Sequence, residues 1–268
     1  MTDKTDLSKA ARAAEQAAYA AGTHLQASRS RLSETLITHQ APGDVVSAID
    51  AETQALIREV VLKHFPDHGF VGEDDPAAGA PHPDDGRPLW VVEPIDGRAN
   101  YLRGYPQYAV AIALVEAGEP QLGVIYDPCR NEFFGAIRGR GAVVNGEPIR
   151  CAKRRTAIES LAATVFPKPT SPCMPVYMAE LGRVLRAFSG VRRSGSMALE
   201  LAYLAAGRID AFWEHDMGAW DAAAGIVLLR ESGALISARD GLPLLSSGSL
   251  LACTPQLYEP FLSLLAEP

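Results

Sequence analysis

The sequence predicts an α+β fold in which layers of helices and sheets alternate. Three observations carry this prediction. Apolar residues recur at helical spacing near the N-terminus, the middle of the chain holds short apolar runs separated by Gly, Pro and Asn, and strand-like and helix-like segments alternate after about residue 150. With 268 residues, 47% of them hydrophobic, the chain can bury a substantial core as one large domain or two subdomains.

The first half of the chain predicts two helices followed by a sheet. Helical spacing of apolar residues is found in two segments, 7–28 and 50–64. Short apolar runs follow at residues 108–116, 121–126 and 132–137, and the Pro-containing breaks between them favour an antiparallel meander. Asn145-Gly146 then supplies a hairpin turn.

The second half predicts alternating strands and helices. We expect strands at residues 161–166 and 209–213, and helices at 176–188, 196–206 and 221–231. Ser196 suits the N-cap of its helix, and Gly233 suits a C-terminal stop. The change of pattern predicts an N-terminal α+β subdomain over residues 1–150 and a C-terminal α/β subdomain over residues 151–268.

The most informative segment, residues 90–104, is an apolar run that ends in two carboxylates and a glycine. The apolar residues up to Val92 have the pattern of a buried strand, and Pro94 cannot donate to a sheet, so we expect the strand to end near Glu93. Glu93 and Asp96 then lie around a rigid bend. Gly97 allows the backbone to approach a ligand closely.

Carboxylates held this close repel one another unless a cation lies between them. Oxygen ligands without a neighbouring histidine or cysteine suit Mg²⁺, Mn²⁺ or Ca²⁺ better than zinc. The alternative is a solvated Asp-Gly turn. Two further acids favour the cation: Glu73 follows another short apolar stretch, and Asp221 opens a helical segment. Taken alone, Glu73 suits an exposed loop and Asp221 a helix cap.

These acids lie in segments that resemble the inositol monophosphatase family of Mg²⁺-dependent, lithium-sensitive phosphomonoesterases. The resemblance extends over nearly the whole chain and rests on four segments: Gly72-Glu73-Asp74, Trp90 to Gly104, Gly195-Ser196 through Asp210 to Glu214, and Trp220 to Gly225 with Glu231-Ser232-Gly233. It implies an αβαβα sandwich of the sugar-phosphatase type, a homodimer, and a cleft that collects ligands from both subdomains.

The resemblance also implies roles for individual residues. Two or three Mg²⁺ ions, or Mn²⁺, would be held by four carboxylates and one backbone carbonyl: Glu73, Glu93, Asp96, Asp221 and Ile95. The implied catalytic residues are Asp44, which would help activate the attacking water, together with Glu73 and Asp96. Gly97 and the N–H of Arg98 would hold phosphate oxygens. The substrate pocket would be formed by Gly195, Ser196, Met197 and Glu214, of which Glu214 would bind a substrate hydroxyl.

The implied reaction is hydrolysis of a small phosphate monoester by metal-activated water. Monoester hydrolysis needs up to about 10²¹-fold acceleration, and the phosphate dianion repels an incoming hydroxide. Two metal ions can activate the water and neutralise the leaving alkoxide. No motif requires a phosphoenzyme. Inositol monophosphate or a related sugar or polyol phosphate is the first expected substrate, and histidinol phosphate is the alternative.

Two residues depart from the family pattern. Glu93 stands where the family has Asp, which moves the carboxylate by one methylene. Arg98 stands where the family has a Thr that helps to take a proton from water, and a guanidinium can neither relay that proton nor coordinate a cation. Arg98 either binds phosphate directly or extends into solvent. The first expectation is therefore a phosphatase with slowed or redirected catalysis, and the alternative is a phosphatase-like protein that binds a metabolite or partner without turnover.

Composition narrows the possible partners. The net charge of −7 argues against nucleic acid and anionic membranes as partners. The family resemblance implies a small phosphorylated metabolite as the partner. The four cysteines show no spacing typical of a zinc site or disulfide framework. The N-terminus has no apolar signal segment and the sequence has no apolar run of about 18 residues, so we expect a soluble, cytoplasmic protein.

Overall fold

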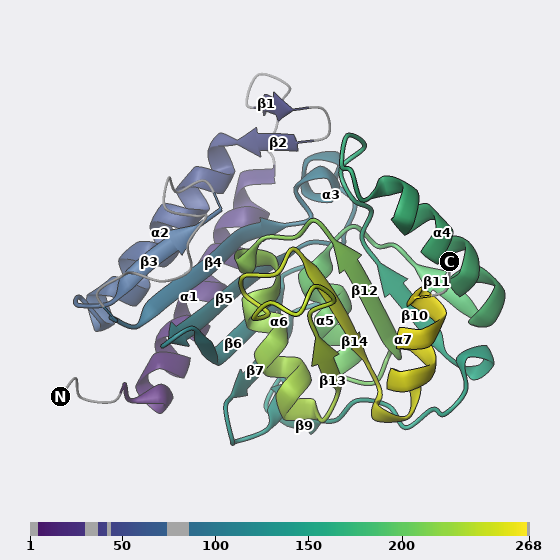
Figure 1. Ribbon diagram of the computed structural model, residues 1–268. Coiled ribbons are helices and arrows are strands. Elements are labelled where there is room, and N and C mark those ends of the chain that lie inside the picture. Colours follow the sequence, from purple (N-terminus) through teal and green to yellow (C-terminus); the bar gives the residue numbers. More distant parts are fainter. Residues whose placement is uncertain (1–4, 30–36, 42–43, 74–85, 267–268) are drawn as a thin grey trace.

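The structure is a computed structural model. It describes residues 5–29, 37–41, 44–73 and 86–266, with the backbone alone described at 37–41 and 44–47. The chain folds into five alternating layers of helices and sheets (Figure 1). This arrangement confirms the αβαβα sandwich expected from the sequence.

The larger sheet has seven strands that lie side by side in chain order: β3 (Gly69–Gly72), β4 (Leu89–Asp96), β5 (Ala109–Glu116), β6 (Glu119–Asp127), β7 (Glu132–Ile137), β8 (Ala142–Val144) and β9 (Glu147–Ile149). Neighbouring strands are antiparallel except β3 and β4, which are parallel. The predicted antiparallel meander is therefore confirmed, because β5, β6 and β7 pair in sequence.

The smaller sheet has five strands in the order β11 (Gly190–Arg192), β10 (Leu161–Thr164), β12 (Ala211–His215), β14 (Ser249–Cys253) and β13 (Leu235–Ser237). Strand β10 is parallel to β11 and β12, whereas β14 is antiparallel to β12 and β13. A separate hairpin is formed by β1 (Ile37–Ala41) and β2 (Asp44–Ser47).

Helices form the other three layers. One face of the larger sheet is covered by α1 (Leu7–Ser28) and α2 (Ala48–His64), α5 (Met197–Ala205) and α6 (Ala219–Ser232) fill the space between the sheets, and α4 (Met174–Ala187) and α7 (Tyr258–Ala266) cover the smaller sheet (Figure 1). The short helix α3 (Arg98–Arg103) follows β4, and two 3₁₀ helices span Ala157–Glu159 and Pro255–Leu257. No helix in the described ranges is both long and apolar enough to cross a membrane.

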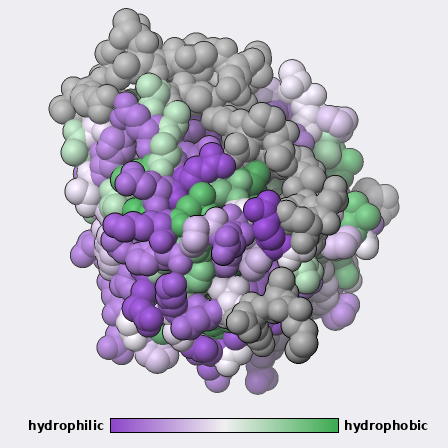
Figure 2. Space-filling model, turned by 90° about the vertical axis from the view of Figure 1, so that its left-hand side faces the viewer, coloured by the Kyte–Doolittle hydropathy of each residue, from purple (hydrophilic) through white to green (hydrophobic). Residues whose placement is uncertain are grey.

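The alternation of side chains along β4 divides the core between the layers. Trp90 and Val92 pack with α1 and α2, whereas Val91 packs with α5 and α6. Helix α6 is apolar on nearly every side because it lies between two sheets. It approaches β6 at Gly123, where a side chain would overlap the carbonyl of Ala224. Outside this core, the side of the molecule turned toward α1 and α2 is mostly hydrophilic (Figure 2).

One expected strand boundary is wrong. Strand β4 does not end near Glu93 but continues to Asp96. Its pairing with β5 shifts register between Glu93 and Asp96, so Pro94 lies at an irregularity where a regular ladder hydrogen bond is not needed. The strand therefore carries both carboxylates at its C-terminal end.

The predicted boundary near residue 150 follows the end of β9 at Ile149. The two sheets do separate there in sequence. However, α5 and α6 belong to the C-terminal part and pack against the larger sheet as well as the smaller one. Division into two subdomains stays a prediction.

Candidate active site

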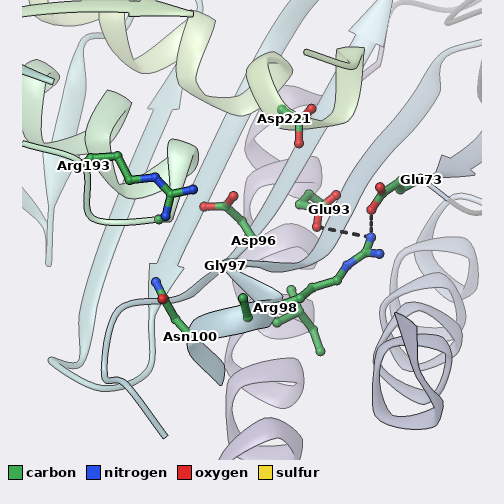
Figure 3. A pocket seen from close by; sticks show the side chains of 11 residues that line it. Glu73, Glu93, Asp96, Gly97, Arg98, Asn100, Arg193 and Asp221 are labelled. Carbon is green, nitrogen blue, oxygen red and sulfur yellow. Dashed lines mark ion pairs between the residues drawn. The ribbon is translucent and has the colours of Figure 1, made fainter. Parts of the chain in front are cut away.

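A polar cavity of about 220 Å³ lies where the C-terminal end of β4 meets the first turns of α3 and α6 and the loop before α5 (Figure 3). It is lined by all five residues expected to hold metal ions: Glu73, Glu93, Ile95, Asp96 and Asp221. Segments more than a hundred residues apart in sequence thus bring their oxygen atoms to one place. Their role as metal ligands stays a prediction.

Asp96 connects the larger sheet to the central helix layer. Its carboxylate accepts hydrogen bonds from the Ser196 hydroxyl and from the backbone N–H groups of Met197, at 3.2 Å, and Ala198, at 2.9 Å. These donors form the N-terminus of α5, where a negative charge is stabilised by the helix dipole. Burial nevertheless raises the pKa of Asp96 to about 7, and the nearby charge of Asp221 contributes to this increase.

Asp221 is both a helix cap and a cavity residue. Its carboxylate accepts a hydrogen bond of 2.7 Å from the N–H of Gly218, which precedes α6. Burial raises the pKa of Asp221 to about 6, while the positive charges of Arg98 and Lys168 act in the opposite direction. Asp221 therefore has the capping role considered from the sequence and also lies among the predicted metal ligands.

Arg98 turns its guanidinium into the acidic cavity. It forms an ion pair with Glu73, its Nε lies 3.5 Å from Oδ2 of Asp50, and its Nη2 lies 3.8 Å from Oε1 of Glu93 (Figure 3). The side chain is only 12% exposed. Extension into solvent, one of the two orientations considered from the sequence, is therefore not found.

The contact with Asp50 reveals an acid that the sequence reasoning missed. Asp50 lies in the first turn of α2, and its side chain is 3% exposed. It shares the buried face of the helix with Thr53, Ile57 and Val61. This spacing was the available signal, because a carboxylate on an apolar helix face needs a charged or hydrogen-bonding partner. Asp44, predicted as catalytic, opens β2 in the part described by backbone alone, so its role stays a prediction.

The turn at Gly97 is held by two further contacts. Gly97 has φ of +92°, and a Cβ there would lie 2.9 Å from the carbonyl oxygen of Gln107. The side-chain amide of Asn100 donates to the carbonyls of Gln107, at 2.7 Å, and Ser194, at 2.9 Å. Asn100 thereby connects this turn to the loop before α5.

Arg193 brings a second positive charge to the cavity. It lines the wall opposite Glu73 and points toward Asp96 (Figure 3). Its guanidinium also lies 4.8 Å from the ring centroid of Phe166, a favourable cation–π contact. No sequence motif predicted roles for Asn100 or Arg193, because both act through contacts between distant segments.

A second cavity of about 380 Å³ adjoins the first and shares four of its residues, Glu73, Asp96, Gly195 and Asp221. Of the residues predicted to bind substrate, Gly195, Met197 and Glu214 line this cavity. Ser196 lines neither cavity, because it is fully buried against Asp96. Gly97 and Arg98 line the first cavity.

Glu214 is a buried carboxylate at the wall of the second cavity. It is 4% exposed, and its Oε2 accepts a hydrogen bond of 2.9 Å from the N–H of Val165. Burial raises the pKa of Glu214 well above its usual value, and the charge of Asp221 adds to this effect. The site therefore contains a carboxyl group suited to a polar neutral partner.

The strand that carries Glu214 is anchored to α4 by a buried acid. Glu180 is fully buried, its Oε2 lies 2.8 Å from Nε2 of His215, and its Oε1 lies 2.6 Å from Nη1 of Arg239. Burial alone would raise the pKa of Glu180, but the hydrogen bonds from His215 and Arg239 outweigh it and hold the pKa below its usual value.

We expect Glu180→Gln to lower the free energy of unfolding by about 3 kcal/mol at pH 7, because it leaves Arg239, whose side chain is 17% exposed, without its counter-charge. The folded-state pKa of Glu180 is depressed, so its contribution is present above the unfolded pKa and is lost as the pH falls through the folded value. The difference between the two proteins should therefore shrink in acid. Urea unfolding from pH 7 down to about pH 2, below the unfolded pKa of a glutamate, measures it, with the exposed Glu147→Gln as control. A difference independent of pH would contradict the charge argument.

The donor set agrees in kind with a divalent cation. Carboxylates and a backbone carbonyl are the oxygen ligands that Mg²⁺, Mn²⁺ and Ca²⁺ prefer. A cation would also relieve the repulsion that raises the pKa of Asp96. Within residues 5–266, as far as they are described, no three His, Cys, Asp or Glu side chains are already grouped to hold a metal ion. The reason is that Glu73 forms an ion pair with Arg98 and that Asp96 accepts hydrogen bonds from the N-terminus of α5.

Comparison with known proteins gives one family. The model of the inositol monophosphatase family matches residues 6–267. An inositol-1-monophosphatase of Mesorhizobium japonicum is 37% identical over 254 residues, which cover 94% of this chain and 94% of the relative. A Nus factor SuhB of Pasteurella multocida is 36% identical over 249 residues, which cover 92% of each.

Solved structures show the same relationship. The extragenic suppressor protein suhB of Bartonella henselae has a TM-score of 0.88 at 33% identity, covering 96% of this chain and 98% of that one. The inositol monophosphatase of Anabaena has a TM-score of 0.83 at 34% identity, covering 97% and 96%. Similarity in sequence and fold along nearly the whole length shows that the chain belongs to the inositol monophosphatase family.

Proposed function

We propose that this protein hydrolyses small phosphate monoesters with a divalent cation as cofactor. Inositol monophosphate or a related sugar or polyol phosphate is the preferred substrate class, and histidinol phosphate comes next. The observation that carries the proposal is the convergence of Glu73, Glu93, Asp96 and Asp221 on one cavity that adjoins a second cavity large enough for a small metabolite.

Asp96, Asp221, Glu93 and the carbonyl of Ile95 would hold Mg²⁺ or Mn²⁺. When bound, such an ion supplies Lewis-acid polarisation of a phosphate oxygen and of the attacking water. Asp96 and Asp221 suit this role because both carboxylates line one cavity and have raised pKa values, so that a cation there would favour the charged form of both.

The remaining residues of the cavity would bind and orient the phosphate. The turn at Gly97 directs backbone into the cavity, and the exposed guanidinium of Arg193 supplies positive charge on the opposite wall. Water would attack phosphorus directly, and no covalent phosphoenzyme is invoked.

Glu214 supports a polyol as the leaving group. One of its oxygens accepts from the N–H of Val165, and the carboxyl group borders the second cavity. A buried carboxyl group can bind substrate hydroxyls, whereas an apolar substrate would leave it without compensation. Met197 and Trp220 line the same cavity and would contact the ring carbons.

Phosphate release from inositol 1-phosphate, histidinol phosphate and p-nitrophenyl phosphate tests the proposal. With MgCl₂ we expect the inositol ester to be turned over best, and a chelator to abolish release. Glu214→Gln should raise KM for the inositol ester about tenfold, the loss expected for one or two weakened hydrogen bonds, and change KM for p-nitrophenyl phosphate little. Glu147→Gln is the matched control. Absence of release from every ester in a folded sample with Mg²⁺ or Mn²⁺ would contradict the proposal.

A second candidate function is binding of a phosphorylated metabolite or a protein partner without turnover. The ion pair of Arg98 with Glu73 favours it, because Glu73 is then engaged within the protein. Relatives that carry the name Nus factor SuhB also favour it. Binding of inositol phosphate or metal without phosphate release would select this candidate.

A further inference from the structure

Arg98 is a fixed positive charge inside a cavity of carboxylates. It contacts acids from three different elements: Asp50 of α2, Glu93 of β4, and Glu73, which follows β3. The guanidinium is permanently charged, and its five N–H donors match carboxylate oxygens. Because the side chain is 12% exposed, these contacts are shielded from solvent. The geometry is that of a bound cation surrounded by its ligands.

The two ends of the cavity differ in how an arginine meets the acids: Arg98 forms ion pairs with Glu73 and Glu93, whereas Arg193 points toward Asp96 from the opposite wall. Figure 3 shows Arg98 and Glu73 at one end and Arg193 at the other, with Asp96 and Glu93 between them and Asp221 above. At the first end the guanidinium already supplies positive charge. Away from Arg98, Asp96 is 7% exposed and Asp221 is partly exposed, and both carboxylates line the same cavity. One divalent cation placed between these two residues would offset their two negative charges.

We propose that the guanidinium of Arg98 takes the place of one divalent cation in this cavity, so that the protein binds one such ion, held chiefly by Asp96 and Asp221, and not two. This inference rests on the proposed cation-dependent function and deepens it. A divalent ion placed at Glu73 would meet the guanidinium within a few ångströms, and like charges so close repel strongly in a partly buried site.

The charge of Arg98 also acts on Asp221, at the proposed position of the remaining cation. It lowers the pKa of Asp221, against the effect of burial. Removing Arg98 should leave Glu73 without its ion pair and open a second position for a metal ion. The side chain of Arg98→Thr is uncharged and cannot block that position. Arg98→Lys keeps the positive charge and should behave like the native chain in stoichiometry.

Mn²⁺ binding measured by electron paramagnetic resonance of the free ion, with substrate absent, tests this inference. We expect one Mn²⁺ for the native chain, one for Arg98→Lys and two for Arg98→Thr. The exposed Arg138→Thr is the matched control and should bind one. The melting temperature in chelator should fall for Arg98→Thr and recover with Mn²⁺ by more than that of the native protein.

A second variant keeps the test decisive if Arg98→Thr does not fold. If Glu73 is the ion-pair partner of Arg98 and does not bind the metal ion, Glu73→Gln should change the Mn²⁺ affinity less than threefold. If Glu73 is a metal ligand, the same substitution should lower the Mn²⁺ affinity at least 10-fold. Two Mn²⁺ ions in the native chain would overturn the inference and leave the proposed function standing. One in the native chain and two in Arg98→Thr, without phosphate release, would support the inference and refute the hydrolase. No Mn²⁺ in either protein would refute both.

Discussion

Asp221→Asn is expected to lower kcat/KM for phosphate release by at least about 10³-fold, because it removes a proposed ligand of the cation that assists hydrolysis. Asp221 lines both cavities, so its charge acts where the phosphate and its leaving group would lie. Asparagine has the same shape and can still accept the hydrogen bond from Gly218, which keeps the cap of α6. The variant therefore removes charge while preserving the local structure.

The same substitution should not destabilise the metal-free protein. Burial makes the charged form of Asp221 unfavourable, and a neutral amide removes that desolvation cost. Initial rates with Mg²⁺ and thermal unfolding in chelator measure the two effects, with the exposed Asp67→Asn as control. A loss of activity below tenfold would contradict the ligand role of Asp221, and a lower melting temperature in chelator would show that its charge stabilises the cap of α6.

Most elements of the fold could be predicted because their signals are local. Helix α1 occupies the residues expected from the Ala-rich helical pattern, and Ser196 caps α5 by accepting from the N–H of Leu199. Gly233 ends α6 with φ of +90°, a conformation that glycine adopts without strain. Each of these features depends on residues within one or two turns of each other.

The residues that form the site could be predicted from the sequence, but their geometry could not. Strands and caps indicated which acids converge, yet the path of Arg98 is set by Asp50, Glu73 and Glu93, which come from separate elements. The continuation of β4 past Pro94 likewise depends on a register shift against β5. Such features follow from tertiary contacts, and no window of sequence contains them.

Two of the acids serve the fold and the site together. Asp96 accepts from the N-terminus of α5, and Asp221 accepts from the N–H that precedes α6. The hydrogen bonds fix each carboxylate and leave it facing the cavity, and the helix termini stabilise its charge. Sequence reasoning treated the cap and the ligand as alternatives for Asp221, whereas the structure places the capping carboxylate in the cavity.

Among glycine-to-alanine substitutions in this site, Gly97→Ala is expected to be the most disruptive. Gly97 has φ of +92°, which costs any other residue about 1–2 kcal/mol. The added Cβ would also lie 2.9 Å from the carbonyl oxygen of Gln107 and 3.2 Å from that of Gly195, so the backbone must shift. We expect a loss of about 3 kcal/mol in the free energy of unfolding.

The backbone shift should also lower activity, because Gly97 lies between Asp96 and Arg98 and packs against the loop before α5. Misplacement of catalytic groups by about 1 Å can cost 10²-fold, so kcat/KM should fall by about that factor. Gly146→Ala is the matched control: its φ is +84° and no atom lies within 4 Å of the added Cβ. Urea unfolding and initial rates of both variants separate backbone strain, which they share, from the steric contact, which only Gly97→Ala has. Equal losses in the two variants would show that the approach of the Gln107 carbonyl plays no part in shaping the site.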